Sequence, residues 1–239
     1  MRQWLGSLAF SVFFVISVAV YASLLFLTLP LPGNDPYRWA VGWAKTILRA
    51  LKIFCRLDYR VSGREHLPDG SAVVLMKHSS TWETVAQILI FPRQTWVLKR
   101  ELIWIPVFGW ALRRLEPIAI DRKSGATAVQ QVLSQGQSRL AEGLCVMIFP
   151  EGTRMPVGQT RRYGLSGALL ASATGKPVVP VAHNAGFFWP RGGWLKRAGT
   201  VRVVIGEPIP TAGRDARAIN DDVQRWIEAQ VAQLAPQGS

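Results

Sequence analysis

Two titratable side chains in the sequence are spaced so that they could move a proton. Both lie in the segment 77–83, which follows the apolar run 72–76 and leads into a segment of helical period that reaches Phe91: they are His78 and Glu83. A carboxylate beside an imidazole can hold its tautomer and stabilise the cation formed when the ring takes a hydroxyl proton. A second interpretation is a helix cap, because Ser80 and Glu83 fit a capping box in which Glu83 bonds back to the Ser80 N–H. The two roles are compatible.

A second reactive segment, 150–154, reads Pro-Glu-Gly-Thr-Arg and follows another apolar run. Gly152 permits a tight turn with an accessible backbone, and Thr153 adds a hydroxyl donor. Arg154 carries the planar fork that suits a phosphate. Glu151 would suit a polyol hydroxyl, because an anion would repel a phosphate. The alternative is a surface turn with an incidental ion pair.

Basic residues also follow two further apolar runs. Lys99 comes after the run 95–98, and Arg122 comes after the run 117–120. Because the carboxyl ends of parallel strands meet at one edge of a sheet, these residues and Arg154 predict an anion site assembled at that edge.

The elements that must position these residues alternate between strand and helix. Apolar, β-rich runs occur at 72–76, 95–98, 117–120, 144–149, 178–182 and 201–205. Helical periods lie between most of them, at 124–140, 165–174 and 215–234. This alternation predicts an α/β fold with a mixed, largely parallel sheet flanked by helices.

The first sixty residues predict attachment to a membrane. The run 4–31 is uncharged and long enough to cross the hydrocarbon layer, and it exceeds the roughly 7–15 apolar residues of a cleavable signal peptide. The segment 38–56 places five basic residues on one helical stripe opposite aromatic and aliphatic residues. That pattern is typical of an interfacial helix, although a domain helix with a solvated charged face has it too.

We therefore divide the chain into two parts. Residues 1–57 form a membrane helix plus an amphipathic interfacial helix, a hairpin that spans the bilayer or enters one leaflet. Residues 58–239 form the α/β domain. Most basic residues follow the apolar run, so the positive-inside tendency predicts that the domain faces the cytoplasm.

The overall charge points to an anionic partner. Lys and Arg number 28 against 15 Asp and Glu, which gives a formal charge of +13, and there are ten tryptophans. Tryptophan is enriched at membrane–water interfaces, so membrane lipids are favoured over nucleic acid as the partner.

Cys55 and Cys145 both lie in apolar runs and match no metal spacing, which indicates buried thiols of a reducing compartment.

Four blocks of the sequence resemble those of the glycerolipid acyltransferases, in the same order. They are His78-x4-Glu83, Ile120-Asp121-Arg122, Phe149-Pro150-Glu151-Gly152-Thr153-Arg154 and Val179-Pro180-Val181. The likeness covers roughly residues 58–210 and is greatest to bacterial members that acylate 1-acyl-sn-glycerol-3-phosphate. The family usually has Asp where this chain has Glu83, which keeps the charge and adds one methylene.

The resemblance implies a reaction without a covalent acyl-enzyme. His78, paired with Glu83, would take the proton of a lysophospholipid hydroxyl, which attacks the thioester of acyl carrier protein or coenzyme A. Arg122 and Arg154, with Lys99 as a weaker candidate, would hold the phosphate. Glu151 and Gly152, beside Thr153, would lie near the glycerol. The resemblance requires no metal and no cofactor beyond the acyl thioester, and it implies a place in the cell inner membrane.

Several alternatives remain open at this point. A membrane-tethered protein that only binds nucleic acid or anionic lipid would use the charge but leave the reactive residues at the strand ends as coincidence. A histidine-dependent lipid hydrolase would share the base. The acceptor could also be glycerol-3-phosphate or a lyso-aminolipid. The run 102–112 is either an acyl-chain groove or a core helix, and the aromatic and basic loop 187–197 contacts either the membrane or an acidic carrier protein.

Overall fold

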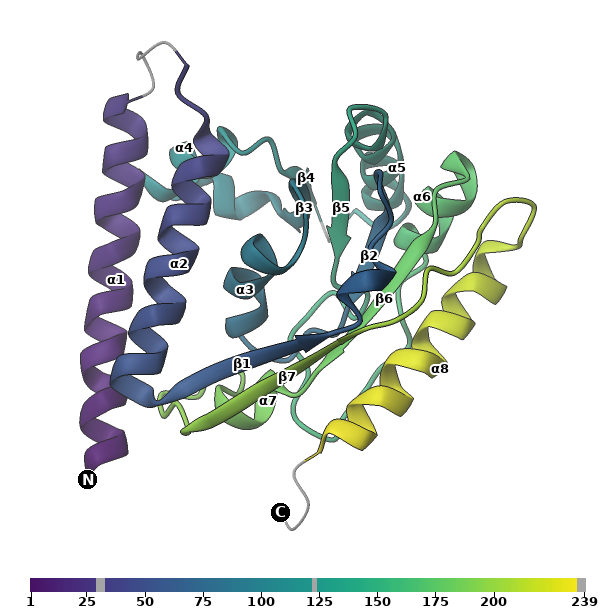
Figure 1. The fold of residues 1–239 in the computed structure, drawn as a ribbon. Helices are drawn as coiled ribbons and strands as arrows, with labels where there is room; N and C mark the ends of the chain where they lie inside the picture. The colour runs from purple at the N-terminus through teal and green to yellow at the C-terminus, as the bar shows by residue number, and fades with distance from the viewer. Residues whose placement is uncertain (29–32, 122–123, 236–239) are drawn as a thin grey trace.

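The strands build one sheet at the centre of the molecule (Figure 1). The computed structural model describes residues 1–28, 33–121 and 124–235, and within these ranges the sheet has seven strands in the order β1-β7-β6-β2-β5-β3-β4. Their bounds are β1 Leu57–Ser62, β2 Val73–Met76, β3 Gln94–Lys99, β4 Ile118–Ile120, β5 Cys145–Ile148, β6 Val178–His183 and β7 Gly199–Ile205. Neighbours pair in parallel except β6 and β7. The predicted mixed, largely parallel α/β sheet is confirmed.

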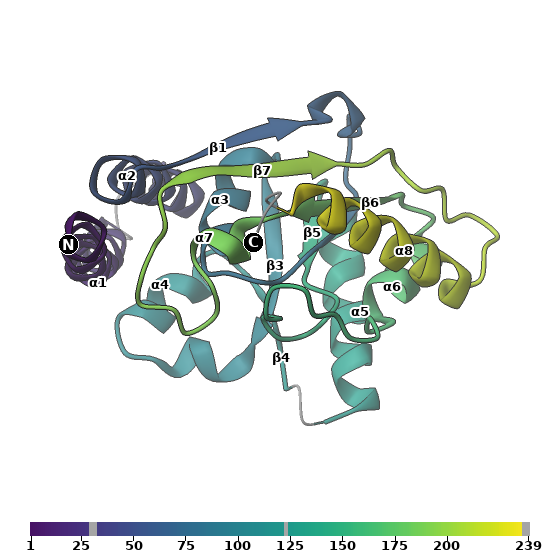
Figure 2. The same ribbon diagram turned by 90° about the horizontal axis from the view of Figure 1, so that it is seen from below.

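Helices cover both faces of the sheet. They are α1 Arg2–Thr28, α2 Pro36–Cys55, α3 Trp82–Ile90, α4 Phe108–Arg113, α5 Ala126–Ala141, α6 Ser166–Thr174, α7 Ala185–Phe188 and α8 Ala216–Leu234, with 3-10 turns η1 Arg64–His66 and η2 Arg100–Trp104. The hairpin of α1 and α2 lies on the opposite side of the molecule from α8 in both views (Figures 1 and 2).

The central strands are apolar at consecutive positions because both of their faces are buried. In β2, Val73 and Leu75 pack with the helices α5, α6 and α8, whereas Val74 and Met76 pack on the opposite side with α2 and α3. Successive side chains of a strand point to opposite faces, so a strand between two helical layers needs an unbroken apolar run. The polar sequence that follows such a run therefore marks the edge of the sheet.

The N-terminal helices pack directly on the α/β domain. On α2, Ile47, Leu51 and Cys55 are buried among side chains of α1, α3 and the sheet, so much of its apolar face is covered by protein. Its basic residues Lys45 and Arg49 are exposed. The structure thus places α2 on the domain with its charged face exposed, and its role as an interfacial helix stays a prediction.

One face of α1 remains apolar and exposed. Ten large apolar side chains of α1 are exposed. The first along the helix is Trp4, which is 56% exposed, and the last is Leu27, which is 71% exposed. By length and composition α1 is a helix that could cross a membrane, and in the described part of the chain it is the one such helix. A row of exposed apolar side chains along one helix is typical of a surface that contacts lipid or another protein.

The opposite face of α1 carries polar residues that are hydrogen-bonded to Lys196. Gln3, Ser7 and Ser11 recur every four residues, so they lie on one stripe of the helix. Lys196 donates from its backbone N–H to Ser7 Oγ at 2.9 Å and from Nζ to Ser11 Oγ at 2.6 Å, and its carbonyl accepts from Gln3. Lys196 Nζ also lies 5.2 Å from the centre of the Trp189 ring. Loop 187–197 is thus a contact for α1, with Trp194 still 40% exposed.

Two local features differ from or refine the sequence-based expectations. β1 was not predicted, because it is an edge strand and only Leu57 of its six residues is buried. The run 102–112 forms the end of η2, a turn and most of α4, with Trp104 and Trp110 exposed at 66% and 49%. A fully buried core helix would not expose these rings.

Candidate active site

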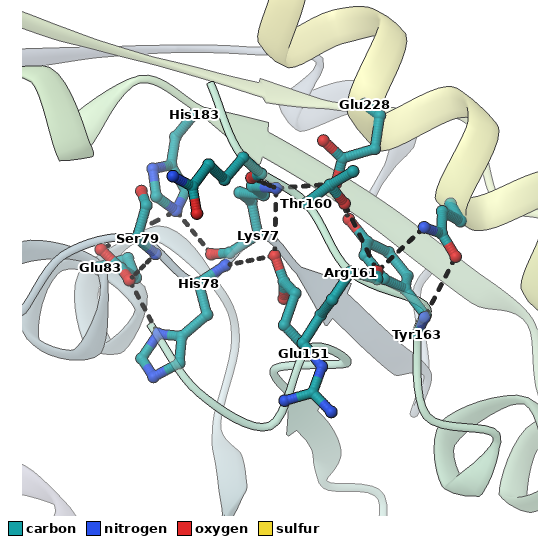
Figure 3. Close-up of polar contacts among 12 residues, drawn as sticks. Lys77, His78, Ser79, Glu83, Glu151, Thr160, Arg161, Tyr163, His183 and Glu228 are labelled. Carbon is teal, nitrogen blue, oxygen red and sulfur yellow. Dashed lines mark hydrogen bonds and ion pairs between the residues drawn. The ribbon is translucent and has the colours of Figure 1, made fainter. Parts of the chain in front are cut away.

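The segment that follows β2 carries the predicted His–Glu pair. His78 Nδ1 lies 2.9 Å from Glu83 Oε1, and the same oxygen accepts the backbone N–H of Ser79 at 2.9 Å (Figure 3). It also accepts the backbone N–H of Ser80 at 2.8 Å. Glu83 therefore both orients the imidazole and caps α3, and its extra methylene still allows it to reach the ring. The helix begins one residue later than the capping box predicts, with Thr81 as the N-cap residue and Ser80 Oγ accepting from the Trp82 N–H.

The Glu83 carboxylate is fully buried and ionised. Burial opposes ionisation, yet the hydrogen bonds from the His78 ring and from the Ser80 amide lower the pKa of Glu83 below its usual value. A buried carboxylate stabilised in this way stays negative while the adjacent imidazole gains a proton. It can therefore stabilise an imidazolium at His78.

His183 supports the pair from behind in its neutral form. Burial lowers the pKa of His183. Its Nδ1 accepts the backbone N–H of Ala185 at 3.2 Å, so Nε2 carries the hydrogen, which it donates to the Lys77 carbonyl at 2.7 Å. Nε2 also lies 3.9 Å from Glu83 Oε2. Since both ring nitrogens are engaged, His183 fixes the backbone beside His78 and is not positioned as a base.

His78 presents its second nitrogen to a cavity. Its ring stacks on Phe149 with centroids 4.1 Å apart and an interplanar angle of 18°. With Nδ1 held by Glu83, the ring has Nε2 for proton transfer, and no residue that the structure describes hydrogen-bonds to Nε2. A general base needs this arrangement, one nitrogen fixed and the other open to the reacting hydroxyl.

The cavity beside His78 has a volume of about 520 Å³ and is mostly apolar. Its apolar walls come from α1, α2, α3, β3 and α4, with Tyr21, Trp43, Ile88, Leu98 and Leu112 as representatives. Its polar lining includes His78, Thr81, Thr153, Arg154 and Arg191. The cavity thus offers both a long apolar wall and cationic side chains to one ligand.

The predicted anion site is assembled in part. Thr153, Arg154 and Lys99 all line the cavity, and Arg154 Nη1 donates to Thr81 Oγ1 at 2.6 Å. Lys99 also pairs with Glu101 at 3.0 Å. Gly152 adopts a φ of +67°, a left-handed conformation that glycine adopts readily and that turns the chain toward Arg154. Arg122 lies outside the described residues.

Glu151 lies behind His78, away from the cavity wall. Its Oε1 accepts the backbone N–H of His78 at 3.2 Å and lies 3.3 Å from Lys77 Nζ (Figure 3). Burial raises the pKa of Glu151 to about 7 despite the Lys77 charge. In this structure the side chain that we expected near a glycerol contacts the backbone of His78.

Replacing Glu151 with glutamine is expected to flatten the pH dependence of stability. A folded-state pKa of about 7, above the ordinary 4.5, means that folding favours the protonated form, so this contribution is present below about pH 4.5 and lost as the pH rises through 7. Between pH 5 and pH 8 the wild type should lose roughly 2–3 kcal/mol of unfolding free energy that the variant keeps. Thermal unfolding of both proteins in detergent measures the difference.

The exposed residue Glu207 provides the control for this experiment. Its glutamine variant should follow the wild-type pH curve. Parallel curves for wild type and Glu151→Gln across pH 5–8 would contradict the expectation.

Three residues of this site were missing from the sequence-based set. Lys77 and His183 each come directly after an apolar run, and this place at a strand end could have identified them as site candidates. Arg191 lies in the loop that follows α7, where no strand end draws attention to it, and it donates to the carbonyl of Arg154 at 3.1 Å. Across the described residues no group of three or more His, Cys, Asp or Glu side chains is arranged to hold a metal ion.

The fold and the site together describe an α/β protein with a His–carboxylate pair beside an apolar cavity. A family model described as Acyltransferase matches residues 58–184, a range that contains His78, Glu83 and Arg154. The chain belongs to this acyltransferase family, and the protein is an enzyme of the transferase class.

Named relatives share most of its length. The chain is 40% identical to a 1-acyl-sn-glycerol-3-phosphate acyltransferase of Pseudomonas aeruginosa, across 98% of this chain and 93% of that protein. It is 26% identical to the human 1-acyl-sn-glycerol-3-phosphate acyltransferase alpha, across 81% and 71% of the two chains. The crystal structure of the 1-acyl-sn-glycerophosphate acyltransferase PlsC from Thermotoga maritima has a TM-score of 0.80 at 22% identity, over 100% and 98% of the chains, which shows the shared fold.

Proposed function

We propose that the protein transfers a fatty acyl group from a thioester to the sn-2 hydroxyl of 1-acyl-sn-glycerol-3-phosphate and so forms phosphatidic acid. The observation that carries this proposal is the position of His78, which combines a buried carboxylate at Nδ1 with an apolar cavity containing Arg154. The 40% identical relative, named for this acceptor, supports the choice of substrate.

In this proposal His78 Nε2 takes the proton of the acceptor hydroxyl as the oxygen attacks the thioester carbonyl. The carbon–oxygen bond forms, the carbon–sulfur bond breaks, and the thiolate of acyl carrier protein or coenzyme A leaves and takes up the proton from the imidazolium. Glu83 stabilises the imidazolium between the two proton transfers. The reaction therefore needs neither a covalent acyl-enzyme nor a cofactor.

The polar and apolar parts of the cavity fit the two ends of such an acceptor. Arg154 and Arg191, with the Thr153 hydroxyl, supply charge-assisted hydrogen bonds to a phosphate. The walls from α1, α2, β3 and α4 accommodate a fatty acyl chain. A phosphorylated acceptor is therefore favoured over a lyso-aminolipid, and an acyl tail uses apolar surface that glycerol-3-phosphate would leave empty.

The exposed face of α1 supports membrane association of the enzyme. We place the protein in the cell inner membrane with the α/β domain toward the cytoplasm, where acyl thioesters are available and phospholipid biosynthesis would use the product. The apolar wall that α1 and α2 give to the cavity would let a lipid tail pass between the bilayer and the site.

The direct test is an acyl-transfer assay on the purified full-length protein in detergent. A radiolabelled acyl thioester is supplied with 1-acyl-glycerol-3-phosphate, with glycerol-3-phosphate, or with no acceptor, and the lipids are separated. Labelled phosphatidic acid with the first acceptor alone is the expected result. Free fatty acid without acceptor would identify a hydrolase, and unconsumed thioester in every mixture would point to a binding protein.

A further inference from the structure

A buried charge network connects the C-terminal helix to the backbone of His78. On α8, Glu228 Oε1 accepts from Lys77 Nζ at 2.7 Å and from the Tyr163 hydroxyl at 2.6 Å (Figure 3). Lys77 Nζ lies 3.3 Å from Glu151 Oε1, and that oxygen accepts the His78 N–H at 3.2 Å. The path from the helix to the catalytic histidine therefore passes through Lys77 and Glu151.

The network is too buried to be an incidental surface ion pair. The side chains of Lys77, Glu151 and Glu228 are 4%, 0% and 25% exposed. Removing one member of a buried ion pair leaves its partner uncompensated and is costly, so these residues depend on one another. None of the three lines the substrate cavity, which excludes direct contact with a ligand there as their role.

The backbone of His78 is held on both sides by this part of the structure. Its N–H donates to Glu151, and its carbonyl accepts the Met155 N–H at 2.8 Å. The preceding carbonyl, of Lys77, accepts from His183 at 2.7 Å. Glu83 then sets the ring itself. Placement of the imidazole thus depends on Lys77 and Glu151 as well as on Glu83.

We propose that Lys77, Glu151 and Glu228 form a positioning network through which α8 sets the placement of the catalytic imidazole. The inference rests on the proposed role of His78 as the base. Misplacing a catalytic group by about 1 Å can cost on the order of 100-fold in rate. Since the network contacts the histidine backbone and leaves the cavity walls untouched, its loss acts on kcat and spares the binding of the acceptor.

The test compares variants of the full-length protein in detergent with an acyl thioester and 1-acyl-glycerol-3-phosphate. Glu228→Ala is expected to lower kcat about 10- to 100-fold, with the KM for the acceptor changed by less than about twofold. The isosteric Glu228→Gln keeps an oxygen for Lys77 and Tyr163, so its kcat should fall between wild type and alanine. Asp221→Ala, which alters an exposed carboxylate on the same helix, should match the wild type.

Other outcomes separate this proposal from the proposed function. Wild-type kcat in Glu228→Ala, while His78→Ala is inactive, would overturn the network alone. A fall in kcat accompanied by an equal rise in KM would also overturn it, because the cavity would then be disturbed. Activity retained by His78→Ala would overturn the base itself. If Glu228→Ala unfolds, the folded Glu228→Gln variant tests the proposal in its place. A wild-type kcat in Glu228→Gln, together with a wild-type kcat in Tyr163→Phe, would then reject the network.

Discussion

Replacement of His78 by alanine is expected to lower kcat by about 10²- to 10⁴-fold, the usual loss for a positioned general base. The imidazole is the group whose Nε2 faces the cavity while Nδ1 is held 2.9 Å from Glu83 Oε1. Its removal takes away the proton acceptor and leaves the apolar walls and the arginines in place. The variant should therefore still bind acceptor, which titration with a fluorescent 1-acyl-glycerol-3-phosphate measures alongside turnover.

His66→Ala is the matched control for this prediction. The His66 ring is bonded to the carbonyl of Ile205 at 2.8 Å, in the turn between β1 and β2, and does not line the cavity. Its kcat should stay within about twofold of the wild type. Equal activities of the two variants would show that His78 is not the base.

Removal of the Arg154 guanidinium is the second change with a large expected effect. Hydrogen bonds to charged groups contribute about 1.5–3 kcal/mol, so Arg154→Ala should lower kcat/KM for the phosphorylated acceptor by roughly 10- to 150-fold. Wild type and variant are compared on 1-acyl-glycerol-3-phosphate and on 1-acyl-glycerol, which lacks the phosphate. The loss should appear with the first acceptor and largely vanish with the second.

Arg162→Ala removes an exposed arginine eight residues further along the chain and serves as the control. It should leave both acceptors unaffected. An equal loss on both acceptors in Arg154→Ala would mean that the side chain supports the structure of the loop, through its bond to Thr81, and does not hold the phosphate.

The positions that the sequence predicted correctly are those that depend on strand ends. His78 and Arg154 each follow a buried apolar run, and parallel pairing of β2 with β5 brings those ends to one edge. The inference used two properties of whole elements, the direction of each strand and its burial. Both can be predicted from the periodicity of apolar residues along the sequence.

The parts that sequence could not supply depend on side-chain direction and on contacts between distant segments. The sequence of the run 150–154 does not predict which of its side chains point inward. In the structure Glu151 contacts the His78 amide, whereas Arg154 lines the cavity. Lys77 and Glu228 are 151 positions apart, and no periodicity links them. β1 escaped detection because an edge strand with one buried residue lacks the apolar run of its neighbours.

The segment 196–205 has a consequence for the order in which the protein can be completed during synthesis. β1 at the edge of the sheet pairs with β7, and the polar stripe of α1 is held by Lys196. The first sixty residues leave the ribosome long before either partner exists. Since α1 and α2 form part of the cavity wall and the lining extends to Arg191, the nascent chain presents its apolar helix well before all the residues of the cavity have been synthesised.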